Sequence, residues 1–175
     1  MINEKIQQAL NDQIQKEFFS SCLYLSMASY LNEIGFKGFS SWMRKQSEEE
    51  LSHGMKIYEY VLTRGGRVYL QQIQQPPVDW NGATNVFDNA LLHEEYITSE
   101  IYKIADIAEE VRDRATLSFL QWFIDEQVEE EAQVRDILRK LRTVGNDTSS
   151  MYDLDDVLGE RGKEECLCSC GCSEE

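Results

Sequence analysis

The 175-residue sequence has few of the residues that break helices or cross-link secreted proteins. It contains two prolines, and four of its five cysteines fall within the last ten residues, which leaves Cys22 as the only cysteine in the body of the chain. A disulfide framework would spread cysteines through the fold, so a reducing compartment is favoured. The scarcity of proline, with long stretches rich in Glu, Gln, Leu, Ala and Lys, predicts a single all-helical domain.

Basic residues and long apolar runs are also scarce. The chain has 17 Lys and Arg against 32 Asp and Glu, for a net charge of −15. Nucleic acids and anionic membranes bind basic surfaces, so we expect neither as a partner. No apolar run reaches the ~18 residues of a membrane span. The start, MINEKIQQAL, lacks the apolar core of a signal peptide, so a cytoplasmic protein is expected. The acidic charge suits cationic partners and equally suits a solvated surface.

Apolar residues recur at helical spacing in four long segments. These run from about residue 4 to 32, 39 to 64, 83 to 110 and 116 to 144, and a short fifth helix is predicted near residues 150–158. The segment GFKG at 35–38 and a break near Arg112 indicate short turns within two helical hairpins.

Residues 66–82 contain Pro76-Pro77 and have no helical period, which indicates an extended connector. At ~3.3 Å per residue it could span ~50 Å, which exceeds the ~40 Å of a long helix. The connector can therefore cross the whole bundle, so we predict a four-helix bundle of two hairpins joined by a long crossover. Residues 1–158 would form this domain. Residues 159–175, an acidic Cys-rich tail, have too little apolar matter to fold alone and are expected to be flexible.

Polar residues interrupt the four apolar stripes at matching positions. They are Glu17, Glu50 and His53 in the first half and, 77 positions later in each case, Glu94, Gln127 and Glu130 in the second. Glu17 and His53 each lie 18 residues from Gly35 (35−17 and 53−35), and the outer pair of the second half is equally spaced about Arg112. At ~1.5 Å per residue, these four residues would each lie ~27 Å from their turn, and therefore at the same depth in the bundle.

Buried carboxylates without partners are costly, so a core that holds four of them requires cations. Any one of these residues alone would be explained as a solvated edge residue or a satisfied core histidine, but the repeated spacing favours metal ligands. One site would use Glu17, Glu50 and His53, and the other Glu94, Glu130 and a shared Glu50. Oxygen ligands with one imidazole suit iron, with manganese or zinc as competitors.

These motifs together resemble those of the prokaryotic non-haem ferritins over about residues 1–158. They are EFFSSCLYLSMA at 17–28, EEELSH at 48–53, LLHEEY at 91–96 and FLQWFIDEQVEEE at 119–131. The resemblance implies the same two iron sites, with Gln127 as a polar partner. It also implies that Tyr24 lies beside the di-iron centre and can supply an electron, although an ordinary core aromatic is the alternative.

The resemblance implies iron storage and detoxification by a ferroxidase. Fe(II) would be oxidised by O₂ or H₂O₂, and Fe(III) mineral deposited in a hollow homo-oligomeric cage of 24 subunits. Glu49, Glu126 and Glu129 would form a third iron site on the lumen side, unless they are simply a solvated helix face. Haem is not expected, because Ser52 precedes His53 and Gln127-x-x-Glu130 lacks the second histidine of bacterioferritins.

Other functions remain open from the sequence. A ferritin-like di-metal oxidase or peroxide scavenger would share the site but store nothing. A helical interaction protein would leave the four acidic interruptions without a cause, and the charge disfavours a DNA-binding mini-ferritin. The tail thiols could bind Cu(I), Zn or an iron–sulfur unit, which we favour, or be redox-active or merely disordered. These thiols belong to Cys166, Cys168, Cys170 and Cys172.

Overall fold

The computed structural model describes residues 2–145 and 147–164, and the described residues form five helices and no strand. The helices are α1 (Glu4–Glu33), α2 (Lys37–Thr63), α3 (Ala83–Glu110), α4 (Arg114–Val144) and α5 (Thr148–Glu164). The predicted all-α class is confirmed. The four tail cysteines lie outside the described residues, and the division into a domain and a tail at residue 158 stays a prediction. None of the described helices combines the length and apolar character that a membrane crossing requires.

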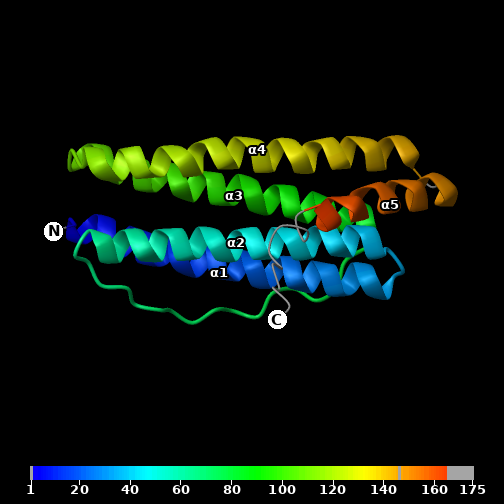
Figure 1. The fold of residues 1–175 in the computed structure, drawn as a ribbon, viewed down its shortest axis with the longest axis horizontal. Coiled ribbons are helices and arrows are strands. Elements are labelled where there is room, and N and C mark those ends of the chain that lie inside the picture. The colour runs from blue at the N-terminus through cyan, green and yellow to red at the C-terminus, as the bar shows by residue number, and fades with distance from the viewer. Residues whose placement is uncertain (1, 146, 165–175) are drawn as a thin grey trace, which may run out of the picture.

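The helices are arranged as two antiparallel hairpins, α1 with α2 and α3 with α4, as Figure 1 shows. The connector between α2 and α3 runs along the length of the bundle, so α3 starts at the opposite end from where α2 finishes and runs parallel to α2. α5 then folds back over α2. The predicted four-helix bundle with a long crossover and a short C-terminal helix is confirmed.

Three of the helices have bounds that differ by two residues or more from those expected. α2 and α4 each begin two residues early, and α5 covers 148–164 rather than 150–158. The first turn is shorter than GFKG because Gly35, at φ 96°, ends α1 in a left-handed conformation. The amide of Phe36 then donates to the carbonyl of Leu31 at 2.9 Å, which closes a Schellman motif. α4 starts early because the Asp113 side chain accepts the amide of Thr116 at 3.1 Å.

Side chains of α1 hold the extended connector in place. The Asn11 side chain accepts the amide of Tyr69 at 2.7 Å and donates to the carbonyl of Arg67 at 3.1 Å. Near the other end, the Tyr30 hydroxyl donates to the carbonyl of Trp80 at 2.5 Å and accepts the amide of Gly82 at 2.9 Å. An extended chain without a strand partner leaves its backbone groups unpaired, and α1 supplies partners for several of them.

Two apolar clusters fill the bundle, and a polar layer separates them. On α1, residues 23–31 belong to one cluster and residues 6–14 to the other. The same division occurs on α2, where residues 39–43 and 57–61 lie in different clusters. The polar layer therefore lies midway along the helices, with sealed apolar packing on both sides.

α5 is held to the start of α2 by a buried carboxylate. Phe36, the N-cap residue of α2, provides no side-chain hydrogen bond. Asp155 of α5 instead accepts the amides of Gly38 at 3.0 Å and Phe39 at 2.7 Å. The approach requires glycine, because a Cβ on Gly38 would lie 1.7 Å from the carbonyl oxygen of Asp155. Asp155 of α5 therefore caps the N-terminus of α2, whose own N-cap residue provides no side-chain acceptor.

Replacing Asp155 with Ala should weaken the docking of α5 by about 1–2 kcal/mol, the usual contribution of an N-cap. Amide hydrogen exchange in α5 should then speed up by roughly 5–30-fold. Asp156→Ala is the matched control, because Asp156 is the exposed neighbour on the same helix. Equal exchange rates in the two variants would contradict the capping role.

Candidate metal centre

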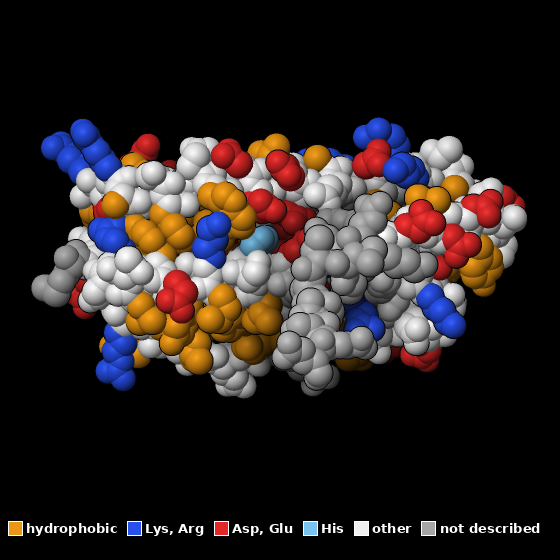
Figure 2. Space-filling model, viewed as in Figure 1, with side chains coloured by type: hydrophobic (Ala, Val, Ile, Leu, Met, Phe, Trp, Pro, Cys, Tyr) orange, Lys and Arg blue, Asp and Glu red, His pale blue; other side chains and the backbone are white. Residues whose placement is uncertain are grey.

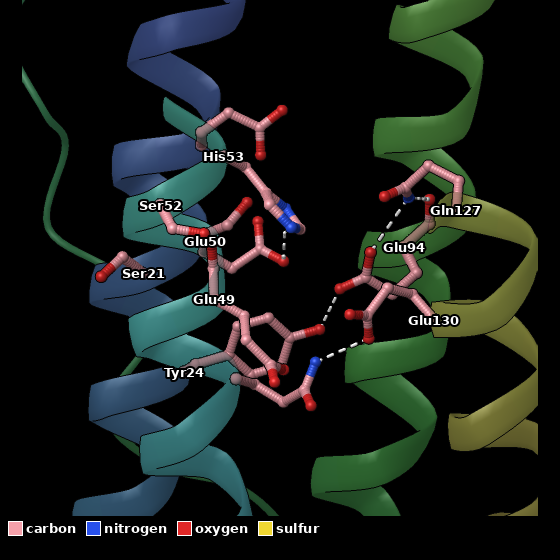
Figure 3. Close-up of polar contacts among 12 residues, drawn as sticks. Ser21, Tyr24, Glu49, Glu50, Ser52, His53, Glu94, Gln127 and Glu130 are labelled. Atoms are coloured by element: carbon pink, nitrogen blue, oxygen red, sulfur yellow. Dashed lines mark hydrogen bonds and ion pairs between the residues drawn. The ribbon is translucent and has the colours of Figure 1, made fainter. Parts of the chain in front are cut away.

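The six predicted residues are all buried in the polar layer. Figure 3 shows Glu50 and His53 of α2 on one side of the layer, facing Glu94 of α3 and Gln127 and Glu130 of α4 on the other. Their exposed fractions are Glu17 1%, Glu50 1%, His53 4%, Glu94 0%, Gln127 3% and Glu130 2%. The helical hairpins explain this convergence, since residues equally far from a turn on two antiparallel helices lie at the same depth.

The residues from α1 and α2 form a compact set of ligand atoms. Glu17, Glu50 and His53 each offer one atom that lies within 4.8 Å of the other two. Glu50 and His53 share one face of α2 because they are three positions apart, and Nδ1 of His53 lies 3.8 Å from Oε1 of Glu50. This geometry can hold one metal ion with two carboxylates and one imidazole.

Three carboxylate oxygens of this set are buried without a hydrogen-bond partner: Oε1 and Oε2 of Glu50, and Oε2 of Glu17. The other oxygen of Glu17 accepts the Gln13 amide at 2.7 Å. No lysine or arginine is buried among the described residues. Carboxylates in such surroundings must bind either protons or a cation. The unpartnered oxygens therefore fit a metal ion.

Burial changes the protonation of this set. It raises the pKa of Glu17 from 4.5 to about 7, and it raises the pKa of Glu50 well above its usual value, with Glu94 and Glu17 adding repulsion. Burial also lowers the pKa of His53 to about 4, assisted by the charge of Lys56. The imidazole is therefore a neutral ligand at physiological pH, and a cation that binds here displaces protons from the carboxyl groups.

The carboxylates from α3 and α4 are held differently, because each has hydrogen-bond donors of its own. The Tyr24 hydroxyl donates to Oε1 of Glu94, and the Gln127 amide donates to Oε2 of Glu94 at 3.1 Å. The Gln46 amide donates to Oε2 of Glu130 at 2.6 Å. Within the described residues, Glu17, Glu50 and His53 are the only set of His, Cys, Asp or Glu with ligand atoms within mutual reach. The two halves of the layer therefore differ in geometry as well as in sequence.

Tyr24 is fully buried and lies between the two halves of the layer. Its exposed fraction is 0%, and its hydroxyl links α1 to Glu94 on α3. Burial raises the pKa of Tyr24 well above its usual value, and the charge of Glu94 adds to the effect. The phenol therefore keeps its proton and remains a donor.

The predicted third set, Glu49, Glu126 and Glu129, lies beside the layer. Figure 2 shows acidic side chains gathered next to a histidine near the middle of the bundle. Burial raises the pKa of Glu126, Glu129 raises it further, and Lys56 opposes the shift. Glu129 itself is exposed. Glu126 and Glu129 are close enough to interact, but the three residues do not form a group of converging ligand atoms in the part of the chain that the structure describes. The third site stays a prediction.

The 77-residue repeat did not predict the two amides that donate hydrogen bonds to the carboxylates. Gln13 and Gln46 each lie four residues before a predicted ligand on the same helix, Glu17 and Glu50 respectively. Their counterparts 77 positions later are Ala90 and Phe123, so the repeat gave no sign of them. The available signal was an amide on an apolar stripe one turn before a glutamate. His93, which accepts or donates a 2.7 Å hydrogen bond with Ser20, was also missed.

Comparisons with known proteins find relatives along nearly the whole chain. The family model of the ferritin-like domain matches residues 7–144. The chain is 40% identical over 161 residues to a bacterial non-heme ferritin of Bacteroides fragilis, covering 92% of this chain and 100% of the relative. It is 35% identical to a bacterial non-heme ferritin of Staphylococcus aureus, covering 94% of this chain and 99% of the relative.

Among solved structures, the chain resembles an open pore ferritin from the archaeon Archaeoglobus fulgidus. The TM-score is 0.90 and the identity 46%, covering 91% of this chain and 98% of the other. The chain thus spans nearly the full length of these relatives.

The raised pKa of Glu17 predicts a pH-dependent stability in the presence of a chelator. Between pH 4.5 and about pH 7, the Glu17 carboxyl group holds a proton in the folded protein but has released it in the unfolded chain. The free energy of unfolding therefore falls as pH rises through this window. Glu17→Gln cannot ionise, so it should be more stable than the unsubstituted protein. Its advantage in urea unfolding should grow across the window to about 3 kcal/mol, at about 1.4 kcal/mol per pKa unit.

Glu48→Gln provides the control, because Glu48 is exposed and lies two residues from Glu50 on α2. Its stability should stay within about 0.5 kcal/mol of the unsubstituted protein at every pH. An advantage of Glu17→Gln that does not change with pH would show that burial does not control this carboxyl group.

Proposed function

The chain belongs to the non-haem ferritin family, and on that premise we propose that it stores and detoxifies iron as a ferroxidase. Fe(II) is the substrate, and O₂ or H₂O₂ is the electron acceptor. The observation that carries the proposal is the set of three unpartnered, buried carboxylate oxygens beside His53. Burial requires these charges to be neutralised by protons or by a cation, and a divalent cation can bind one atom each of Glu17, Glu50 and His53.

The ligand set that we propose has one shared residue. The first iron binds Glu17, Glu50 and His53, and the second binds Glu50, Glu94 and Glu130. Glu50 suits a bridging role because both of its oxygens are buried without a hydrogen bond, which leaves one for each metal ion. Gln127 contacts Glu94 through its amide and orients that carboxylate from the side of α4.

Electron transfer from the two Fe(II) ions is favoured by the charge of the site. Four carboxylates concentrate negative charge in a medium of low dielectric, which stabilises Fe(III) more than Fe(II). The proton that Glu17 holds below about pH 7 leaves as iron binds. The Tyr24 hydroxyl already donates to Glu94, so Tyr24 can supply a further electron while its proton moves to that carboxylate.

The two halves of the polar layer differ in how their carboxylates are hydrogen-bonded, and this difference favours iron that binds, is oxidised and leaves the site. Iron at the α1–α2 set gains oxygens that have no other partner, whereas iron at Glu94 and Glu130 must compete with Tyr24, Gln127 and Gln46 for the carboxylates. Breaking hydrogen bonds to a charged group costs about 1.5–3 kcal/mol each. The second position is therefore weaker and releases its product more readily. Glu49, Glu126 and Glu129 provide the next acidic ligands on that route.

We further propose that the mineral collects in a hollow homo-oligomeric cage of 24 subunits in the cytoplasm. The bundle exposes large apolar side chains on several helices, which subunit contacts can bury. They include Leu25 50%, Leu92 65%, Val128 62% and Val157 63%. We expect the assembly to bind no haem, nucleic acid or membrane.

Removing both a carboxylate and the imidazole should abolish rapid oxidation. In the double variant Glu17→Ala, His53→Ala, the initial rate of Fe(II) oxidation under O₂ should fall to the uncatalysed background. Circular dichroism should show an unchanged helical content, because the variant removes a buried charge that destabilises the fold without a cation. Glu48→Ala serves as the control, and an unchanged initial rate in the double variant would sink the site assignment.

Iron loading separates storage from an oxidase or peroxide scavenger with the same site. After aerobic loading with excess Fe(II), size-exclusion chromatography should show iron co-eluting with a large assembly, in amounts far above the two ions that each chain binds. Iron that saturates at two ions per chain and elutes with a single bundle would identify the non-storing enzyme instead.

A further inference from the structure

A line of three rings leads from the polar layer to the surface. Tyr24 is fully buried beside Glu94, and its ring meets that of His93 edge-on, with 6.4 Å between centroids. The ring of His93 in turn lies 6.2 Å from that of Tyr96, which is 46% exposed. Tyr24 comes from α1, whereas His93 and Tyr96 share one face of α3, three positions apart. The arrangement joins the most buried tyrosine to a surface tyrosine through one intervening ring.

His93 is fixed in this line by its neighbours. Its Nε2 forms a 2.7 Å hydrogen bond with the hydroxyl of Ser20 on α1, and the ring of Phe19 packs against it with 5.9 Å between centroids. Two surface hollows of about 270 Å³ each meet here, and both are lined by Phe19, His93 and Tyr96. A small solute can therefore reach Tyr96 and the outer edge of His93 without approaching the carboxylates.

We propose that Tyr24, His93 and Tyr96 form a relay that carries an oxidising equivalent from the di-iron site to the protein surface. The relay rests on the proposed ferroxidase function. It connects the buried site to Tyr96, where a soluble reductant can deliver electrons. His93 is a positioning residue that fills the gap between the two phenols, because electron transfer through packed rings is faster than through a gap.

The electrons and protons of the relay balance in three steps. First, Tyr24 gives one electron to the peroxide-level product that two Fe(II) ions leave from O₂, and its phenolic proton moves along the existing hydrogen bond to Glu94. Next, Tyr96 gives an electron to the Tyr24 radical across His93, Glu94 returns the proton to the Tyr24 oxygen, and Tyr96 releases its own proton to water. Finally, a one-electron reductant in solution supplies an electron to the Tyr96 radical, which takes up a proton from water.

The relay serves the reaction because two Fe(II) ions supply only two of the four electrons that convert O₂ to water. Tyr24, re-reduced through Tyr96 after each transfer, supplies the third and the fourth electron in two successive cycles. A third electron drawn from Tyr24 would leave a radical in the core, next to the ligands. Moving the radical to the exposed Tyr96 protects the buried site, and a soluble reductant can then reduce Tyr96 again. Glu94 supports this cycle, because it accepts the proton of Tyr24 along the existing hydrogen bond and can return it when Tyr24 is reduced again.

The test compares two exposed tyrosines of α3. The protein is loaded with Fe(II), mixed with O₂ and freeze-quenched, and the tyrosyl radical is followed by electron paramagnetic resonance with and without ascorbate. Tyr96→Phe removes the end of the relay. Tyr102→Phe is the matched control, because Tyr102 is 47% exposed on the same helix and has no ring contact among the described residues. Both substitutions keep the ring and remove only the hydroxyl, so the fold should be retained.

We expect a radical in the unsubstituted protein and in Tyr102→Phe that ascorbate quenches. In Tyr96→Phe the ascorbate-accessible signal should be lost, and a longer-lived signal that ascorbate does not reach should remain on Tyr24. In Tyr24→Phe no radical should form at Tyr96, and His93→Leu should reproduce the effect of Tyr96→Phe.

Other outcomes separate the relay from the proposed function. A radical in Tyr96→Phe that ascorbate quenches as fast as in Tyr102→Phe overturns the relay. Rapid Fe(II) oxidation with no tyrosyl radical in the unsubstituted protein also overturns it and leaves the ferroxidase intact. Absence of Fe(II) oxidation in the unsubstituted protein overturns both.

Discussion

Four buried carboxylates with no buried lysine or arginine among the described residues are the constraint on which the rest of this structure depends. Glu17, Glu50, Glu94 and Glu130 are each at most 2% exposed, and the described residues bury no lysine or arginine with them. Charges of one sign at such depth repel one another and lose their hydration. The fold can carry them only with protons or cations in place, so the stability of the bundle and its affinity for metal ions are set by the same groups.

The surroundings of these carboxylates divide the layer into two kinds of site. Glu94 and Glu130 have hydroxyl and amide donors, which lower the cost of their burial. Glu50 has none, and Glu17 has one donor for two oxygens. A bundle evolved for stability alone would have supplied donors to all four. Fold stability therefore does not explain the unpartnered oxygens of Glu17 and Glu50, whereas a role in metal binding does.

The remaining architecture keeps this layer in register. Apolar clusters on both sides prevent water from relieving the charges. The connector hydrogen-bonds along α1, which fixes the position of α3 relative to α1, and α5 caps the start of α2 through Asp155. Each of these contacts lies away from the carboxylates, yet each helps to position a helix that carries candidate ligands. Small shifts between helices would separate atoms that now lie within 4.8 Å.

Much of this could be read from the sequence. The helical periods, the proline-containing connector and the 77-residue repeat determined the four long helices, their connection and the common depth of the six polar residues, because each depends on spacing along one chain. The sequence could not determine which side chains donate to which carboxylate. Gln13, Gln46 and His93 lie on stripes where an amide or an imidazole has several explanations, and only the packing of one helix on another chose between them. For the same reason, the cap that Asp155 gives α2, 117 positions away, is set by tertiary structure alone.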